Sequence, residues 1–321
     1  MANQNIGTPR FYIDKTAYLK TAGIAKADDG EDCFGLNASN LYSFTGDGTT
    51  MSLNFNNYND VLHSESYNFL AVLGHTLKTD EGNLDDIRLG WTDGSHIQDA
   101  QDDASGKSVN ITTSYLNPDY DGFSIMPFEE FNASHYGLYI YPVNTIVNTI
   151  TQLGTVAIGK YYDMPHSPEL SLTMSHEYDG VKKQETAGGS TLSYVNYYKP
   201  PDWGDLQAWQ LDGWDRKYSG RRVWDLTFNY LSDSDIEPYN YHIDSSSGNS
   251  DWKDNWFTNV IHYTNGGQLP FIFCPDPSIV YDDSTWTIPE FAICRFDMKT
   301  FKREQVANGV YNIKVKIKES W

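Results

Sequence analysis

The sequence holds few cysteines, and no two of them stand at a metal-binding spacing. Its 321 residues include three, Cys33, Cys274 and Cys294. A small, odd number argues against a disulfide framework, and without a Cys-x-x-Cys pair a zinc site built from thiolates is not expected. We therefore expect all three thiols to be reduced and mostly buried.

The sequence also has little that would direct it into or across a membrane. Its opening, MANQNIGTPRFYID, has no basic stretch followed by an apolar one, which predicts no secretion signal. No run of about 18 apolar residues occurs, so no membrane-spanning helix is expected. These features predict a protein that is made in the cytoplasm.

Positive charge is scarce. Lysine and arginine number 23 against 43 aspartates and glutamates, so the formal net charge is −20. An acidic surface repels phosphate backbones and anionic lipids, and we expect neither nucleic acid nor a membrane as a partner. Charge of one sign also favours solubility at high concentration, which suits a protein needed in many copies.

Recognisable catalytic motifs are missing. There is no phosphate-binding glycine loop, no dinucleotide-binding fingerprint and no nucleophile elbow. His176 and Glu177 stand together without the second histidine of a zinc protease helix. We therefore expect no enzyme. A pair of carboxylates for glycoside hydrolysis stays open as an alternative, because a sequence does not show how far apart two acids lie.

Aromatic residues are abundant, at 15% of the chain. They suit pleated, half-buried surfaces and tilt the expectation towards β-structure. Between residues 41 and 160, short apolar runs such as MSLNF, NFLAVLG and YGLYIYPV alternate with clusters of turn residues. Many short strands separated by turns are typical of a sandwich or a barrel.

Two prolines, Pro165 and Pro168, indicate a break between domains near Pro168. We expect three segments: residues 1–40 as an N-terminal arm with one short helix capped by Asp14, residues 41–168 as a first β-domain, and residues 169–321 as a second β-rich domain. The fold class expected is mainly β, with a few short helices.

The second half has clear periodic patterns. Alternation in RRVWDLTFNYLS predicts a half-buried antiparallel strand, and LPFIFCPD and EFAICRFD predict two more strands. Helical spacing in DNWFTNVIHYT predicts a helix with Asp254 or Asn255 as its cap. The faces expected to be buried are Trp224, Leu226, Phe228 and Tyr230 in the first strand, and Phe257, Val260, Ile261 and Thr264 in the helix.

The last strand, in VYNIKVKIKES, alternates most strictly. Its apolar side chains are expected on one face and its lysines on the other, where a row of lysines would also discourage pairing at a sheet edge. The apolar residues are Tyr311, Ile313, Val315 and Ile317, and the lysines are Lys314, Lys316 and Lys318.

Some residues are candidates for binding. Trp91 stands beside a polar turn and is a candidate for stacking on a sugar ring, with His75 and His96 near it in sequence. Residues 28–32 and 83–86 offer carboxylate oxygens, so calcium remains a candidate ligand there, although neither has the spacing of an EF-hand. Otherwise these side chains are expected to close turns, to pack in the core or to face solvent.

Several short segments stand out when they are taken together, among them NIGTPRFYID, NFLAVLGHTL and LGTVAIGKYYDMP. The first is similar to the opening of many structural proteins of tailed bacteriophages, and the other two together resemble the galactose-binding-like jelly roll of phage tail and fibre proteins. GRRVWDLTFNYLSDSDI, YTNGGQLPFIFCPD and VYNIKVKIKESW look like the C-terminal domain that accompanies it. The resemblance implies two β-sandwich domains, the first a jelly roll and the second facing the assembly.

The resemblance also implies a role. We expect a structural subunit of the virion, in the tail or its tip, made in the host cytoplasm and assembled in multiple copies through aromatic-rich interfaces. Its partners would be copies of itself and other virion proteins. Two alternatives stay open: a head-decoration or head–tail connector protein, and a module that binds a host surface glycan.

Overall fold

The apolar runs between the turn clusters form strands, and the chain is mainly β, as predicted. The helices among the described residues are short: α1 (Lys15–Thr21), α3 (Asp233–Ile236) and the π-helix η4 (Phe257–His262). The computed structural model describes residues 6–21, 25–27, 36, 42–45, 51–57, 66–73, 79–80, 83–84, 86–92, 107–110, 123–132, 135–141, 150–178, 180–195, 202–203, 206–207, 220–238, 255–279 and 290–320.

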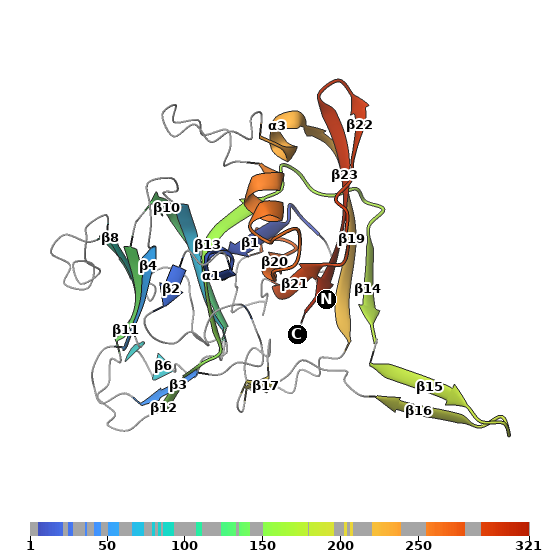
Figure 1. Ribbon diagram of the computed structural model, residues 1–321, viewed down its shortest axis with the longest axis horizontal. Coiled ribbons are helices and arrows are strands. Elements are labelled where there is room, and N and C mark those ends of the chain that lie inside the picture. Colours follow the sequence, from blue (N-terminus) through green and yellow to red (C-terminus); the bar gives the residue numbers. More distant parts are fainter. Residues whose placement is uncertain are drawn as a thin grey trace.

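One ten-stranded antiparallel sheet forms the centre of the described structure (Figure 1). β1 lies in its middle, although it comes first in the sequence. The strands in order are β10 (Phe123–Asn132), β5 (Ser66–Leu73), β13 (Thr155–Asp163), β1 (Arg10–Asp14), β20 (Phe271–Cys274), β21 (Ala292–Phe296), β23 (Val310–Glu319), β19 (Arg221–Ser232) and β14 (Thr173–Glu177), with β22 (Arg303–Ala307) also paired to β23.

This sheet takes strands from both sides of Pro168. β13 precedes that residue and β19 follows it, while β1 comes from the expected N-terminal arm and pairs with β13 on one side and β20 on the other. Segments 1–40, 41–168 and 169–321 therefore share one layer. Their bounds stay a prediction about folding units.

The central strands are buried on both faces. In β1, Phe11 and Ile13 belong to one hydrophobic core and Tyr12 to another, and β20 alternates in the same way. A strand covered on both sides has no polar face, which is why β20 reads as the unbroken apolar run FIFC. The two cores thus lie on opposite faces of one sheet.

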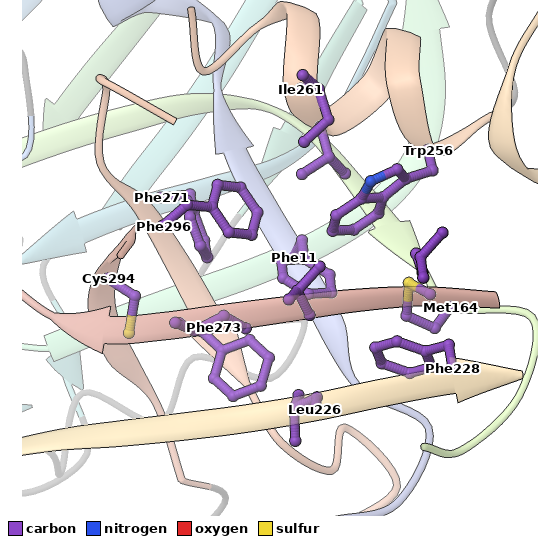
Figure 2. Packing of buried hydrophobic residues seen from close by; sticks show 14 of the residues in the cluster. Phe11, Met164, Leu226, Phe228, Trp256, Ile261, Phe271, Phe273, Cys294 and Phe296 are labelled. Carbon is purple, nitrogen blue, oxygen red and sulfur yellow. The ribbon is translucent and has the colours of Figure 1, made fainter. Parts of the chain in front are cut away.

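The core on the η4 side is rich in aromatic rings (Figure 2). Phe11 packs edge-on to Trp256, with ring centres 5.0 Å apart, and Phe271 lies 4.7 Å from Phe296. Trp256 and Val260 bring η4 down onto this face and are buried. Large rings in edge-on and tilted contact give this core much of its buried apolar area.

The opposite face carries the second core, in which Phe69, Ala157 and Ile272 pack around Tyr12. A second sheet stands beside β10 and β5 (Figure 1), which makes this part of the fold β-sandwich-like. The strands of the second sheet are β2 (Ala25–Ala27), β4 (Met51–Asn57), β11 (His135–Tyr141), β8 (Asp86–Thr92) and β9 (Lys107–Asn110).

Four further strand pairs complete the described β-structure. They are β3 (Tyr42–Thr45) with β12 (Ile150–Leu153), β6 (Thr79–Asp80) with β7 (Asn83–Leu84), β15 (Val181–Glu185) with β16 (Thr191–Val195), and β17 (Asp202–Trp203) with β18 (Leu206–Gln207). Among them, β15 and β16 form a hairpin that projects away from the main sheet (Figure 1).

The predicted helix near residue 257 is present, in the wider π form. The Asn255 side chain accepts a hydrogen bond from the Thr258 amide at 2.9 Å, so Asn255, one of the two predicted candidates, caps the turn that leads into η4. Bonds of the i→i+5 type place residues four and five apart on one face. Trp256, Val260 and Ile261 therefore all point into the core.

β19 follows its predicted alternation up to one point. Trp224, Leu226 and Phe228 are fully buried, as expected, but Tyr230 is 77% exposed and its predicted burial is wrong. The pairing of β19 with β23 shifts between Phe228 and Leu231, and Tyr230 has a φ of +60°. This bulge turns Tyr230 outwards and puts Leu231 into the core in its place.

β23 shows the predicted alternation, but its lysines do not guard an edge. The strand lies inside the sheet, between β21 and β19, so the edge-protecting role is wrong. Lys316 instead pairs with Asp297 and Lys318 with Glu177, each at 2.6 Å on the solvent-facing side. The buried residues of the strand include Ile313, Val315 and Ile317.

The segment with the two prolines connects the middle of the sheet to its far end. Met164 is buried and its amide donates to the Pro9 carbonyl at 3.1 Å, while the Glu169 amide donates to the Thr227 carbonyl at 2.8 Å. These contacts guide the chain from β13 across to β14 (Figure 1). The chain enters its second half at β14, the last strand of the sheet, and continues into the hairpin.

Candidate assembly surface

The hairpin of β15 and β16, residues 181–195, is here called the arm. Its turn is set by local chemistry: the Thr186 hydroxyl accepts the Ser190 amide at 3.0 Å, and the Thr186 carbonyl accepts the Gly189 amide at 2.9 Å. Gly189 has a φ of +80°, which glycine adopts without a steric penalty. A three-residue loop with a left-handed glycine is a common hairpin closure.

The two faces of the arm differ in chemistry. Residues directly opposite each other in an antiparallel pair project from the same face. One face, here called the Leu192 face, carries the pairs Lys182–Tyr194 and Gln184–Leu192; the other carries Val181–Val195, Lys183–Ser193 and Glu185–Thr191.

Large apolar side chains are exposed mainly in one part of the described chain. Six of the eight exposed large hydrophobic residues lie between residues 170 and 195, which we call the arm region. These residues are Leu170, Met174, Tyr178, Leu192, Tyr194 and Val195. A lone two-stranded hairpin such as the arm is marginally stable in water, since neither of its faces is covered.

The arm continues from β14, which ends the main sheet. Among the described strands β14 pairs with β19 alone, so its outer side presents a row of backbone N–H and C=O groups. Its residues Thr173 to His176 are exposed. Together β14 and the arm offer both backbone hydrogen-bonding groups and apolar side chains to a partner.

The opposite end of the sheet, β10, is built differently. It contains Pro127, a shift in register between Pro127 and Phe131, and the exposed acids Glu129 and Glu130. Proline, bulges and charge are the devices that discourage pairing at an edge. β14 carries neither a proline nor a bulge, so β14 is the edge suited to association.

A cluster of titratable side chains lies where α1 meets η4. The Asp14 carboxylate accepts the amides of Thr16 and Ala17 at 2.9 and 3.3 Å, which confirms it as the cap of α1. Burial raises the pKa of Asp14 to about 7. Nearby, the Tyr18 hydroxyl lies 3.0 Å from His262 Nε2. The Tyr18–His262 contact joins α1 to η4, whereas the bonds to Asp14 fix the first turn of α1.

Lys15, beside this cap, is buried as well. Its Nζ lies 4.6 Å from the centre of the Tyr263 ring and 5.7 Å from that of Tyr67, so the ammonium group is placed over aromatic faces. Such contacts stabilise a cation that has left water. The lysine therefore fastens the first helix to the end of η4 and to β5.

The described cysteines are poor nucleophiles. Cys274 and Cys294 are free and buried, as predicted, while Cys33 lies outside the described residues. Burial raises the pKa of Cys274 to about 12 and that of Cys294 well above its ordinary value. A thiol reacts through its thiolate, which both sites disfavour at neutral pH.

Within the described part of the chain, no group of three or more His, Cys, Asp or Glu side chains is placed to hold a metal ion. The candidate calcium loop at residues 28–32 lies outside that part. Of the other, Asn83 and Leu84 form β7 and Asp86 begins β8. No described helix is long and apolar enough to cross a membrane.

Of the three predicted sugar-binding residues, the structure describes one, Trp91. Trp91 lies in β8, where its backbone is opposite Tyr136 of β11 and Lys107 of β9. His75 and His96 fall outside the described residues. A glycan site at these three residues stays a prediction.

The arm, residues 181–195, was not among the elements predicted from the sequence. Its signal was the run ETAGGST, in which turn residues separate two stretches rich in β-forming and polar residues. Comparison with known proteins gives no relative: no protein-family model matches the chain, and no curated protein matches it. The case for the arm region therefore rests on its geometry and chemistry.

Proposed function

We propose that this chain is a structural subunit that assembles in multiple copies, as a tail or tail-tip component of a tailed bacteriophage particle. The observation that carries the assembly role is the arm region. A projecting hairpin with apolar side chains on uncovered faces, next to an unprotected sheet edge, is costly in an isolated molecule and useful in an assembly.

The fold supports the same role. A broad sheet with a core on each face is a rigid support, and rigid parts assemble without a large ordering cost. The place in a phage particle comes from the sequence resemblance, as do the jelly-roll form of the first domain and the assembly-facing role of the second. In this proposal the partners are other copies of the chain and neighbouring virion proteins.

Sedimentation velocity over a wide range of concentration, together with electron microscopy of the same sample, tests the assembly role. We expect closed multi-copy particles or rings, because symmetric repetition of one interface is the usual way to build them. A protein that stays monomeric at the highest concentrations would contradict it. Mass spectrometry of purified tailed particles tests the phage assignment, which fails if the chain is absent from them.

A further inference from the structure

Adjacent residues in the arm point to opposite faces, and this separates its charges. Lys182 projects from the Leu192 face, where its Nζ lies 5.9 Å from the centre of the Tyr194 ring. Lys183 projects from the other face, together with Glu185. The Leu192 face thus combines two large apolar side chains with one positive charge and no acid.

The charge of the arm is opposite to that of the chain. Two lysines and one glutamate give residues 181–195 a formal charge of +1, so the other residues sum to −21. Surfaces of opposite sign attract one another during encounter and fix the register of docking. The Leu192 face therefore fits an acidic surface with an apolar centre.

We propose that the Leu192 face of the arm binds the acidic surface of a second copy of this chain. The inference rests on the proposed function, because many copies at high local concentration make that surface the acidic partner at hand. Leu192 and Tyr194 supply the apolar contact, and Lys182 supplies the charge that steers it. The opposite face of the arm stays in solvent.

Further apolar side chains are exposed at the base of the arm, where Met174 lies in β14 and Tyr178 follows it. When the Leu192 face of one copy binds the acidic surface of the next, each copy uses two different surfaces, which is a head-to-tail contact. Such contacts form rings when the rotation closes.

Two neighbouring substitutions test which face is used. Leu192→Glu places a charge in the proposed contact, and Ser193→Glu places the same charge on the opposite face, one residue away. We expect Leu192→Glu to raise the dissociation constant between copies at least tenfold and Ser193→Glu to leave it within about twofold of wild type, by sedimentation velocity. Both variants should keep the wild-type thermal unfolding curve, because the arm contributes nothing to either core.

The adjacent lysines form a second matched pair. Lys182→Glu should weaken association and reduce its dependence on salt, because it reverses a charge that attracts the partner at the contact. Lys183→Glu should change association little, because Lys183 projects from the opposite face of the arm. Carbodiimide cross-linking of a mixture of isotope-labelled and unlabelled wild-type protein should join Lys182 to an acidic residue of a different copy.

The outcomes separate the two proposals. A wild-type protein that assembles, with Leu192→Glu and Ser193→Glu assembling equally well, overturns the role of the arm and leaves the structural function standing. Wild-type protein that does not assemble contradicts the structural function and with it the arm contact. Cross-links from Lys182 to acids of its own copy, or to a different protein in purified particles, also overturn the proposed partner.

Discussion

At the scale of single residues, Asp14 shows how one side chain serves two elements. It ends β1 and caps α1, so it must be buried at their junction. Burial raises its pKa from 3.8 to about 7, because a carboxylate loses its hydration there. Between these two values the folded chain keeps a proton that the unfolded chain has released, so this group costs stability as the pH rises.

Replacing Asp14 by asparagine should remove that cost while keeping an oxygen to cap α1. We expect Asp14→Asn to gain stability relative to wild type as the pH rises from 4 to 8, by up to about 4 kcal/mol. Urea unfolding at several pH values measures the difference. Wild-type and variant stabilities that stay parallel across this range would contradict the expectation.

Arg222 is the centre of a buried ion pair. Its guanidinium donates to both carboxylate oxygens of Glu319, at 3.0 and 3.3 Å, and it also bonds Glu290 and the Phe291 carbonyl. Glu319 is fully buried in the last strand. The pair fixes the end of β23 against the start of β19, which are 97 residues apart.

Removing one partner of this pair should be costly, because the other is left charged in the interior. We expect Glu319→Gln to lower the free energy of unfolding by about 3 kcal/mol. Asp297→Asn, which breaks the exposed pair with Lys316, should cost less than about 1 kcal/mol. Chemical denaturation of both variants measures the contrast, and equal losses would show that the buried pair has no special weight.

At the scale of elements, the bulge of β19 explains an exposed aromatic residue. Tyr230 has a φ of +60° and lies in solvent, so the strand tolerates a strained residue that buries little. Two residues earlier Phe228 is fully buried. Substitutions at Phe228 and at Tyr230 should therefore have very different effects on stability.

We expect Tyr230→Asn to leave stability unchanged or to raise it by up to about 1 kcal/mol, since asparagine enters the left-handed region more easily. Phe228→Ala should cost about 3–5 kcal/mol by opening a cavity in the core. Thermal unfolding of the two variants gives the comparison. A large loss in Tyr230→Asn would mean that its ring has a folded-state role within the monomer.

At the scale of the whole molecule, β1 ties the two halves together. It lies in the middle of the ten-stranded sheet, and its Arg10 makes a bidentate pair with Asp163 across the junction with β13. Phe11 contacts rings of η4, β20 and β21. A change in β1 therefore affects strands from both halves of the chain.

Calorimetry should show one cooperative transition, and Phe11→Ala should shift all of it to lower temperature, with a loss of about 3–5 kcal/mol. One transition is expected because a single sheet crosses the boundary near Pro168. Two separate transitions, with one unmoved by Phe11→Ala, would favour independent domains at residues 41–168 and 169–321.

Features that depend on neighbours in sequence were predictable. The alternation of β23, the cap at Asp14 and the cap at Asn255 follow from strand period and from side chains that bond amides two or three residues ahead. The mainly β class follows in the same way from short apolar runs between turns.

Pairings between distant segments were decided by the tertiary structure. No local pattern places β1 between β13 and β20, because Arg10 and Asp163 are 153 residues apart and many strands offer an equivalent edge. The interior position of β23 and the exposure of Tyr230 at a bulge depend on that pairing. By itself the sequence determined the strands with a clear apolar pattern, such as β19, β20 and β23; packing of both faces of the sheet decided their neighbours and left the arm uncovered.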